Sequence, residues 1–188
     1  ALADFRRDPE KAPLKTPSRK SEIYSERLAK IAAEWQLSEG ELISPIPRFY
    51  STWEMPGDKL QEKYPLQCYG YHGHGRIHST FHNLPWLREQ FPDHVLINPI
   101  DAKARGIKTD DLVRVFNDRG TVEIRAKVTP RIMPGVTSIP QGAWYTPVVK
   151  DGKTVDVGGN INTLTHHRPS PLAKGNAQHT VLVQIEKA

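Results

Sequence analysis

Short apolar or alternating segments, separated by turn residues, are the feature that most constrains the fold of this 188-residue chain. Residues 121–128 alternate apolar and polar side chains, which is the period of a strand with one buried face. Residues 117–120, Asn-Asp-Arg-Gly, have the composition of a hairpin turn. Further short β-type runs lie at 94–97, 112–116, 136–139 and 180–185. This pattern predicts a mainly β domain, a small barrel with a few flanking helices, and argues against a doubly wound sheet.

Two helices are predicted beside the strands. In residues 21–36 the apolar side chains recur at spacings of four, three and four: Tyr24, Leu28, Ile31 and Trp35. Such a stripe is typical of an amphipathic helix, and Ser21 is a suitable N-cap. A shorter helix is expected over residues 100–105, because Asn98 and Pro99 suit its start and Gly106 suits its end.

The N-terminal third differs from the rest in composition. Residues 1–20 are rich in Lys, Arg and Pro, and residues 43–65 hold four prolines. We therefore expect residues 1–65 to form an extended arm, a helix and an irregular crossing segment, followed by a barrel domain over 66–188. The first residue is not Met, which leads us to expect a processed chain or a fragment.

Charge and hydropathy exclude some classes of partner. The net charge is +5, and much of the excess lies in the first 20 residues. Aromatic residues do not interleave with this basic run, which argues against nucleic-acid binding. No apolar run is long enough to cross a bilayer. A single cysteine, Cys68, rules out a disulfide framework within the chain and suits a small buried side chain better than a reactive thiol.

A histidine-rich stretch, residues 75–83, is the first candidate site and is called the histidine segment below. His78 and His82 have the spacing of a helical zinc pair, but nearby glycines disfavour a helix. Ser79 lacks the G-x-S-x-G elbow of a hydrolase. Arg76 with Ser79 and Thr80 has the donors that hold a phosphate, and neutral imidazoles suit an organic ligand. An ordinary surface turn is the alternative.

Residues 158–165, Gly-Gly-Asn-Ile-Asn-Thr-Leu-Thr, form the second candidate site, the asparagine segment. The primary amides of Asn160 and Asn162 both donate and accept in one plane, which matches the edge of a fused heterocycle such as pterin or guanine. The alternative is that these amides only stabilise a local Asx turn. Residues 175–179, just before the last strand, have a similar composition.

Together these segments resemble the molybdopterin oxidoreductase family. Residues 16–25 are similar to its T-P-S-G-K-x-E-x-Y-S stretch, with Arg19 in place of the usual Gly. Arg76-x-His78-Ser79 resembles the opening of the family's C-terminal dinucleotide-binding domain. Further matching motifs follow in order: Pro99-x-Asp101-Ala102, Gly106-Ile107, Asp111-x-Val113, Arg119-Gly120, Pro134-Gly135-Val136, Gly142-Ala143-Trp144-Tyr145 and Asn160-x-Asn162-x-Leu164-Thr165. The likeness covers residues 16–188 and is greatest to large catalytic subunits of the dimethyl sulfoxide reductase type.

The resemblance implies a double-psi β-barrel, the aspartate-decarboxylase-like fold, that binds bis(molybdopterin guanine dinucleotide) with molybdenum. The positions that it implies as cofactor contacts are Arg76, His78, Ser79, Thr80, Asn160, Asn162, Gln178 and His179. Trp144 either lines the pocket or packs. The resemblance implies no catalytic residue or metal ligand in this chain, because the molybdenum ligand and the iron–sulfur cysteines belong to upstream domains.

The resemblance also implies a function: the cofactor-binding C-terminal portion of an enzyme that reduces S- or N-oxides in anaerobic respiration. The expected partners are the remainder of the catalytic subunit, an iron–sulfur electron-transfer subunit and a membrane anchor subunit, with no nucleic acid. The expected location is the periplasmic face of the membrane. Two alternatives are a stand-alone interaction module and a self-processing decarboxylase. The latter needs a Gly-Ser cleavage site, and the sequence has no Gly-Ser dipeptide.

Overall fold

The computed structural model describes residues 2–49, 51, 53–176 and 179–188. The chain divides into two compact units. One comprises Ala1–Tyr50 with Ser170–Lys174 and is called the arm unit. The other, the barrel unit, comprises Ser51–Pro169 with Gly175–Ala188.

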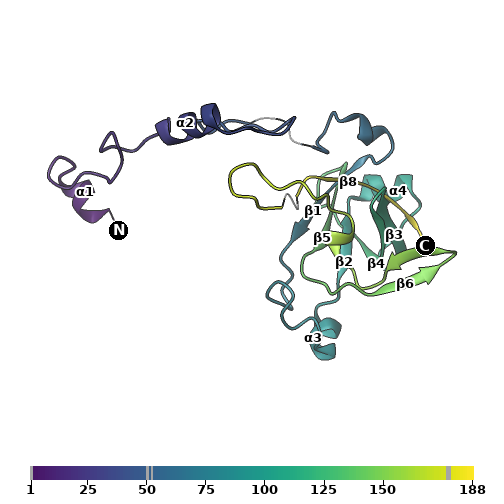
Figure 1. Cartoon of the computed structure of the whole chain (residues 1–188). Coiled ribbons are helices and arrows are strands. Elements are labelled where there is room, and N and C mark those ends of the chain that lie inside the picture. The colour runs from purple at the N-terminus through teal and green to yellow at the C-terminus, as the bar shows by residue number, and fades with distance from the viewer. Residues whose placement is uncertain (1, 50, 52, 177–178) are drawn as a thin grey trace. The chain divides into compact units, whose positions relative to one another are not determined.

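Most strands of the barrel unit form a closed barrel (Figure 1). The described strands are β1 (Leu66–Tyr71), β2 (His94–Ile97), β3 (Leu112–Asn117), β4 (Gly120–Val128), β5 (Val136–Pro140), β6 (Pro147–Lys150), β7 (Lys153–Asp156) and β8 (Val181–Lys187). Six of them follow the order β2-β5-β1-β8-β3-β4, and β4 pairs back with β2. The pairs β1–β5 and β2–β4 are parallel, and the other four pairs of the ring are antiparallel.

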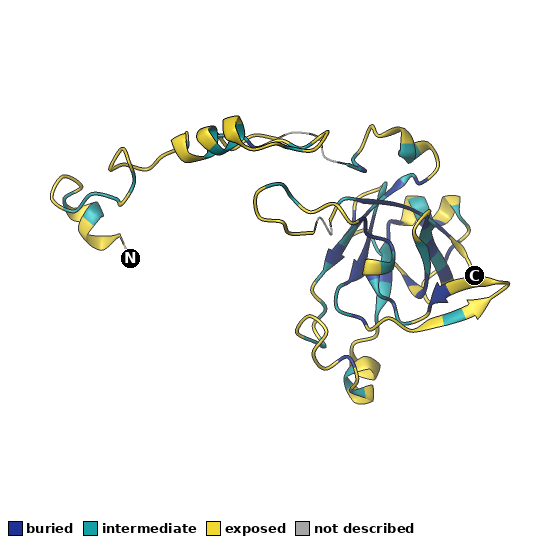
Figure 2. Ribbon diagram, viewed as in Figure 1, coloured by how far each residue is buried: buried dark blue, intermediate teal, exposed yellow. Residues whose placement is uncertain are grey.

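Alternate residues of these strands fill the barrel. In β4, for example, Val122, Ile124 and Ala126 are buried while Arg125 and Lys127 are exposed. The dark-blue stretches in Figure 2 therefore concentrate on the strands of this unit. The other inward residues include Leu66, Cys68, Val95, Ile97, Val113, Val115, Ile139, Val181, Val183 and Ile185. The prediction of a mainly β domain with few helices is confirmed.

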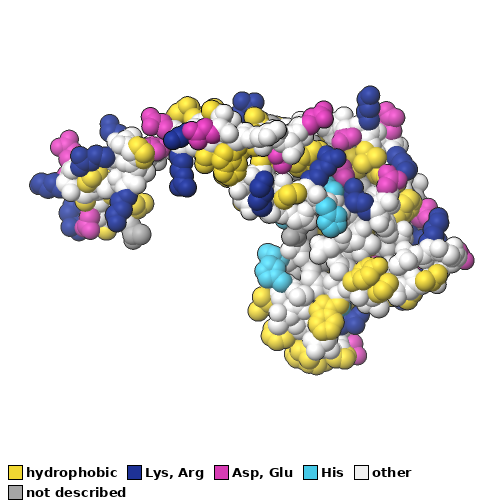
Figure 3. Space-filling view, in the orientation of Figure 1, with side chains coloured by type: hydrophobic (Ala, Val, Ile, Leu, Met, Phe, Trp, Pro, Cys, Tyr) yellow, Lys and Arg dark blue, Asp and Glu magenta, His cyan; other side chains and the backbone are white. Residues whose placement is uncertain are grey.

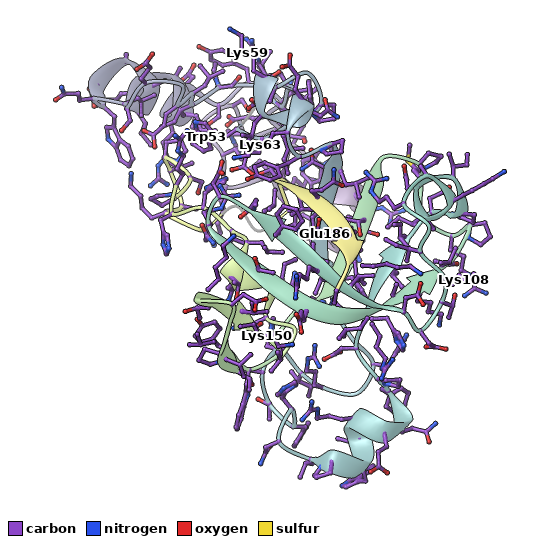
Figure 4. The ribbon with its side chains drawn as sticks, turned by 90° about the vertical axis from the view of Figure 1, so that its right-hand side faces the viewer. Trp53, Lys59, Lys63, Lys108, Lys150 and Glu186 are labelled. Carbon is purple, nitrogen blue, oxygen red and sulfur yellow. The ribbon has the colours of Figure 1, made fainter. Side chains whose placement is uncertain are left out.

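The hairpin of β6 and β7 was not predicted, although its turn has a clear signal. Asp151 and Gly152 have φ angles of 50° and 74°, as in the type I′ turn that Asp-Gly favours. Lys150 of β6, labelled in Figure 4, donates to Glu123, a buried carboxylate of β4. β7 runs parallel to β4 where Asp156 is the partner of Val122. The hairpin thus places Asp156 against the barrel wall.

The two helices beside the strands are short. α4 (Pro99–Ala104) begins as predicted, because the Asn98 side chain accepts from the Ile100 N–H at 2.9 Å. Gly106 follows it with a φ of 65°, the left-handed conformation of a helix end. α3 (Pro85–Gln90) was not predicted and has Pro85 in its first turn. The described residues of the unit also form two 3₁₀ turns, η1 (Lys59–Glu62) and η2 (Ile161–Thr163).

The arm unit contains α1 (Ala3–Arg7) and α2 (Glu26–Glu34). The basic leader is therefore not extended throughout. The predicted helix over residues 21–36 is shorter at both ends, because Ser25, and not Ser21, caps α2 by accepting from the Leu28 N–H. At the other end, Trp35 already has an extended ψ of 135°. Neither helix buries a residue.

Candidate functional site

The histidine segment begins beside the chain that leaves β5. β1 and β5 are parallel, and their last residues, Tyr71 and Pro140, are register partners. Parallel neighbours end at the same edge of a sheet, so the segments that follow them start together. One leads into the histidine segment and the other is residues 141–146, called the tryptophan segment.

The Arg76 side chain fastens these two segments together. Its Nε donates to the Gln141 carbonyl at 2.8 Å, and its Nη1 donates to Asp93 at 2.7 Å. Nη1 also lies 3.4 Å from His82 Nδ1. Only 6% of the Arg76 side chain is exposed. The guanidinium predicted to contact a phosphate is therefore largely committed to contacts within the protein.

A close backbone approach adds to this connection. Gly142 has a φ of 85°, and a Cβ there would lie 1.8 Å from the His78 carbonyl oxygen, so no other residue fits. The Trp144 Nε1–H donates to the Ser79 carbonyl at 2.9 Å. The Trp144 ring also lies beside the His82 ring, with centroids 5.9 Å apart. The Trp144 ring is therefore held by contacts within the protein, although 49% of the residue is exposed.

Asp156 holds the asparagine segment against the tryptophan segment. Its carboxylate accepts from the backbone N–H groups of Thr146 at 2.7 Å, Gly158 at 3.0 Å and Asn160 at 2.6 Å. A Cβ on Gly158 would lie 2.0 Å from the Trp144 carbonyl oxygen. The histidine, tryptophan and asparagine segments are thus linked in series and form one polar surface.

Several predicted contact residues are exposed on this surface: His78, Ser79, Thr80 and Asn162. His78 has a φ of 49°, a left-handed conformation for a residue with a side chain. The Asn160 Oδ1 accepts from the Asn162 N–H at 3.0 Å and caps η2. The structure therefore shows the Asx turn that was the alternative for Asn160. The Asn162 side chain is exposed and has no hydrogen-bond partner among the described residues.

His179 lines a separate hollow of the barrel unit. A cavity of about 340 Å³ lies at the end of β1, between Gly70, Tyr71, His72, Gln141, Asn176 and His179. Gln141 is shared with the tryptophan segment, so this cavity adjoins the surface described above. Gln178, also a predicted contact, lies outside the described residues.

Burial controls the protonation of two histidines. Burial lowers the pKa of His82, and the positive charges of Arg76 and Arg88 lower it further. Burial also lowers the pKa of His166, whose two ring nitrogens have no hydrogen-bond partner among the described residues. The Trp53 ring, labelled in Figure 4, lies edge-on to His166 at 5.7 Å. Burial raises the pKa of the Cys68 thiol to about 12, which makes it inert as a nucleophile.

Residues that organise this surface were missed by sequence reasoning. Asp93, Gln141 and Asp156 each contribute a contact between segments. Asp156 precedes Gly158-Gly159, and an acidic residue before a glycine turn is a recognisable signal. Asp93 and Gln141 have no such signal, because their partner Arg76 is 17 and 65 residues away.

The described part of the chain lacks two kinds of feature. No helix there is long and apolar enough to span a membrane. No group of three or more His, Cys, Asp or Glu residues there is arranged to hold a metal ion.

Known proteins are similar to this chain along its whole length. Haemophilus influenzae dimethyl sulfoxide reductase DmsA is 54% identical over 187 residues, which are 100% of this chain and 23% of that protein. A dimethyl sulfoxide/trimethylamine N-oxide reductase of Cereibacter sphaeroides is 38% identical over 98% of this chain and 22% of its own length. The chain thus spans less than a quarter of the curated relatives it matches.

A solved structure, acetylene hydratase from Pelobacter acetylenicus, has the same fold. The TM-score is 0.73 at 21% identity, over 96% of this chain and 25% of that one. The sequence over residues 66–182 matches the family described as "Molydopterin dinucleotide binding domain". These matches confirm the resemblance to molybdopterin oxidoreductases. Because the matched residues make up more than half of the sequence, the chain belongs to the molybdopterin dinucleotide-binding domain family.

Proposed function

We propose that the barrel unit binds bis(molybdopterin guanine dinucleotide) in an enzyme that reduces S- or N-oxides in anaerobic respiration. The family match and the names of the relatives support this function. The observation that carries it is structural. Three segments, of which the histidine segment is far in sequence from the other two, are held together at one end of the barrel, where they expose imidazole, hydroxyl and amide groups.

The chemistry of these groups fits the cofactor. Pterin and guanine edges carry both donors and acceptors, so they match neutral side chains that do both, such as His78 and Asn162. The hydroxyls of Ser79 and Thr80 are donors for phosphate oxygens. The Arg76 side chain is buried and already bonded to Asp93 and to the Gln141 carbonyl. We propose that it acts mainly by fixing the residues around it. Direct contact by Arg76 or Asn160 stays a prediction.

The residues of this chain would bind and orient the cofactor. When bound, the molybdenum cofactor supplies the oxygen-atom transfer chemistry. The buried contacts of Arg76 and Asp156 keep the backbone of the three segments fixed before binding, which lowers the entropic cost of ordering them. We propose further contacts from Gln178 and His179, with Trp144 as a packed edge of the surface.

We further propose that the barrel has the double-psi topology. The two parallel pairs, β1–β5 and β2–β4, in an otherwise antiparallel ring of six described strands support this assignment. The proposed domain covers residues 66–188, and the family match over 66–182 agrees with its start.

The proposed partners are the remainder of the catalytic subunit, an iron–sulfur electron-transfer subunit and a membrane anchor subunit at the periplasmic face. We expect the iron–sulfur cysteines and the molybdenum ligand in the remainder of the subunit. Exposed apolar side chains gather around α3 (Figure 3), among them Ile77, Phe81, Trp86 and Phe91. A surface of this kind supports burial against another part of an assembly.

Cofactor retention in the full-length protein tests the proposed function. We expect His78→Ala and Asn162→Ala to retain several-fold less molybdenum and guanine dinucleotide than the wild type. Each substitution removes a protein side chain that would form a hydrogen bond with the ligand. Thr154→Ala, at an exposed threonine of β7, is the control and should retain the wild-type amount. Wild-type molybdenum in both variants would contradict the assigned contacts. Failure of the wild-type protein to reduce dimethyl sulfoxide or trimethylamine N-oxide would contradict the proposed reaction.

A further inference from the structure

His82 lies where the contacts of the histidine and tryptophan segments converge. Only 5% of the residue is exposed. Its backbone N–H and the Trp144 Nε1–H both donate to the Ser79 carbonyl, at 3.4 Å and 2.9 Å. Its ring lies beside the Trp144 ring. Any movement of the imidazole would therefore reach the exposed residues 78–80 through Trp144.

The contact with Arg76 determines which ring nitrogen of His82 carries the proton. Arg76 Nη1 lies 3.4 Å from His82 Nδ1. A guanidinium has only donors and stays charged, so Nδ1 must be the acceptor. A neutral imidazole with an accepting Nδ1 carries its hydrogen on Nε2.

Other contacts fix the guanidinium that sets this arrangement. Arg76 donates to Asp93 and to the Gln141 carbonyl, and its Nη2 lies 3.5 Å from the Pro140 carbonyl. A buried, charge-assisted pair of this kind holds its geometry more firmly than an exposed one. Arg76 therefore presents an N–H to His82 in a fixed direction.

We propose that His82 is a positioning residue, held by Arg76 and Asp93 as the neutral Nε2–H tautomer, which keeps Trp144 and residues 78–80 in a ligand-binding arrangement. The proposal deepens the proposed function, since it takes residues 78–80 as part of the cofactor site. His82 itself need not touch the cofactor.

The charges around His82 favour the neutral ring. Arg76 and Arg88 oppose a proton on it, while Asp93 and Asp156 favour one. Asp93 is already paired with Arg76, and Asp156 already accepts from three N–H groups. A second proton would also turn Nδ1 from an acceptor into a donor that faces the Arg76 N–H. Protonation therefore breaks the contact that fixes the ring.

Nitrogen-15 solid-state NMR of the histidine-labelled full-length protein tests the tautomer directly. His82 is assigned by the signals that disappear in His82→Gln, and Nε2 is identified by its bond to Cδ2. We expect an unprotonated Nδ1 and a protonated Nε2 at neutral pH. A proton on Nδ1, or on both nitrogens, would overturn the inference whether or not the protein binds the cofactor.

Acid-induced cofactor loss tests the positioning role. We expect wild-type protein to retain molybdenum at pH 7 and to release it about tenfold faster when the pH falls below the ordinary histidine pKa of about 6.5. His82→Gln, which cannot take up a proton, should lose this acid-dependent rise, whereas His167→Gln, at an exposed histidine, should keep it. An unchanged acid-dependent rise in His82→Gln would contradict the positioning role. Absence of molybdenum from the wild type would instead contradict the proposed function.

Discussion

The histidine and asparagine segments reach the same surface but are held there by different chemistry. The histidine segment is held by a cation, Arg76, which donates to a carboxylate and to carbonyl oxygens. The asparagine segment is held by an anion, Asp156, whose donors within the described residues are backbone N–H groups. Both buried groups connect their segment to the tryptophan segment. The difference is in what remains when the group is removed.

Removing Asp156 leaves more hydrogen-bonding groups without a partner than removing Arg76 does. Asp156 is 1% exposed, and the three N–H groups from which it accepts belong to Thr146, Gly158 and Asn160, whose hydrogen bonds to it are partly buried. Asp93, the main partner of Arg76, has a side chain that is 19% exposed. Loss of Arg76 therefore leaves a carboxylate that water can partly reach. A backbone donor that loses its acceptor inside a protein costs about 1–3 kcal/mol when it is fully buried and less when water reaches it. Because three donors lose their acceptor with Asp156, against one partly exposed carboxylate with Arg76, the asparagine segment should be the more sensitive of the two.

Asp156→Ala should have the largest effect. We expect a loss of about 4 kcal/mol of local stability, because three backbone donors lose their acceptor. Hydrogen exchange of the full-length protein, measured by mass spectrometry, should accelerate at least a hundredfold in both the tryptophan and asparagine segments. Asp156→Asn keeps one acceptor oxygen and should lose about half as much. Equal exchange in the Ala and Asn variants would show that accepting N–H groups is not the role of this side chain.

Arg76→Ala should have an intermediate effect. We expect local stability to fall by about 2–3 kcal/mol. This is at or below the low end of the cost of breaking a buried ion pair, because the Asp93 side chain keeps some contact with water. Exchange should accelerate in the histidine and tryptophan segments and stay unchanged in η2. The double variant Arg76→Ala/Asp93→Asn should be less unstable than Arg76→Ala alone. If the stability loss of the double variant equalled the sum of the losses of the two single variants, the pairing of Arg76 with Asp93 would be refuted.

Much of the fold could be predicted because strand signals are local. The alternation in residues 121–128 and the Asn98 cap of α4 each need only neighbouring residues, and both predictions hold. The signal of the turn at Asp151-Gly152 is equally local, so the hairpin of β6 and β7 was also predictable from the sequence, although it was not predicted. Which strands become neighbours is not local. The pairing of β1 with β5 joins residues about 70 positions apart, and no pattern in either strand specifies the other.

The candidate site, like the fold, has features that depend on neighbouring residues and features that depend on residues far apart in the sequence. Exposure of His78 and Asn162 agrees with the sequence argument, because polar side chains among small residues favour surface turns. The state of Arg76 could not be predicted, since a free guanidinium and a buried one have the same sequence context. Its partners Asp93 and Gln141 come together only when the barrel closes. The sequence therefore identifies side chains that suit a ligand, but it does not show which of them are already hydrogen-bonded within the protein.

Trp144→Phe should have the smallest effect and separates the contact between segments from the packing of the ring. Phe keeps a ring beside His82 but has no N–H to donate to the Ser79 carbonyl, so we expect a loss of about 1 kcal/mol. Hydrogen exchange should rise about fivefold in the histidine segment and change little in the asparagine segment, because the Asp156 contacts do not involve this ring. Trp144→Ala removes both ring and donor and should give a larger rise. If Phe and Ala had the same effect, the ring contact with His82 would contribute nothing, and the histidine segment would depend on hydrogen bonds alone.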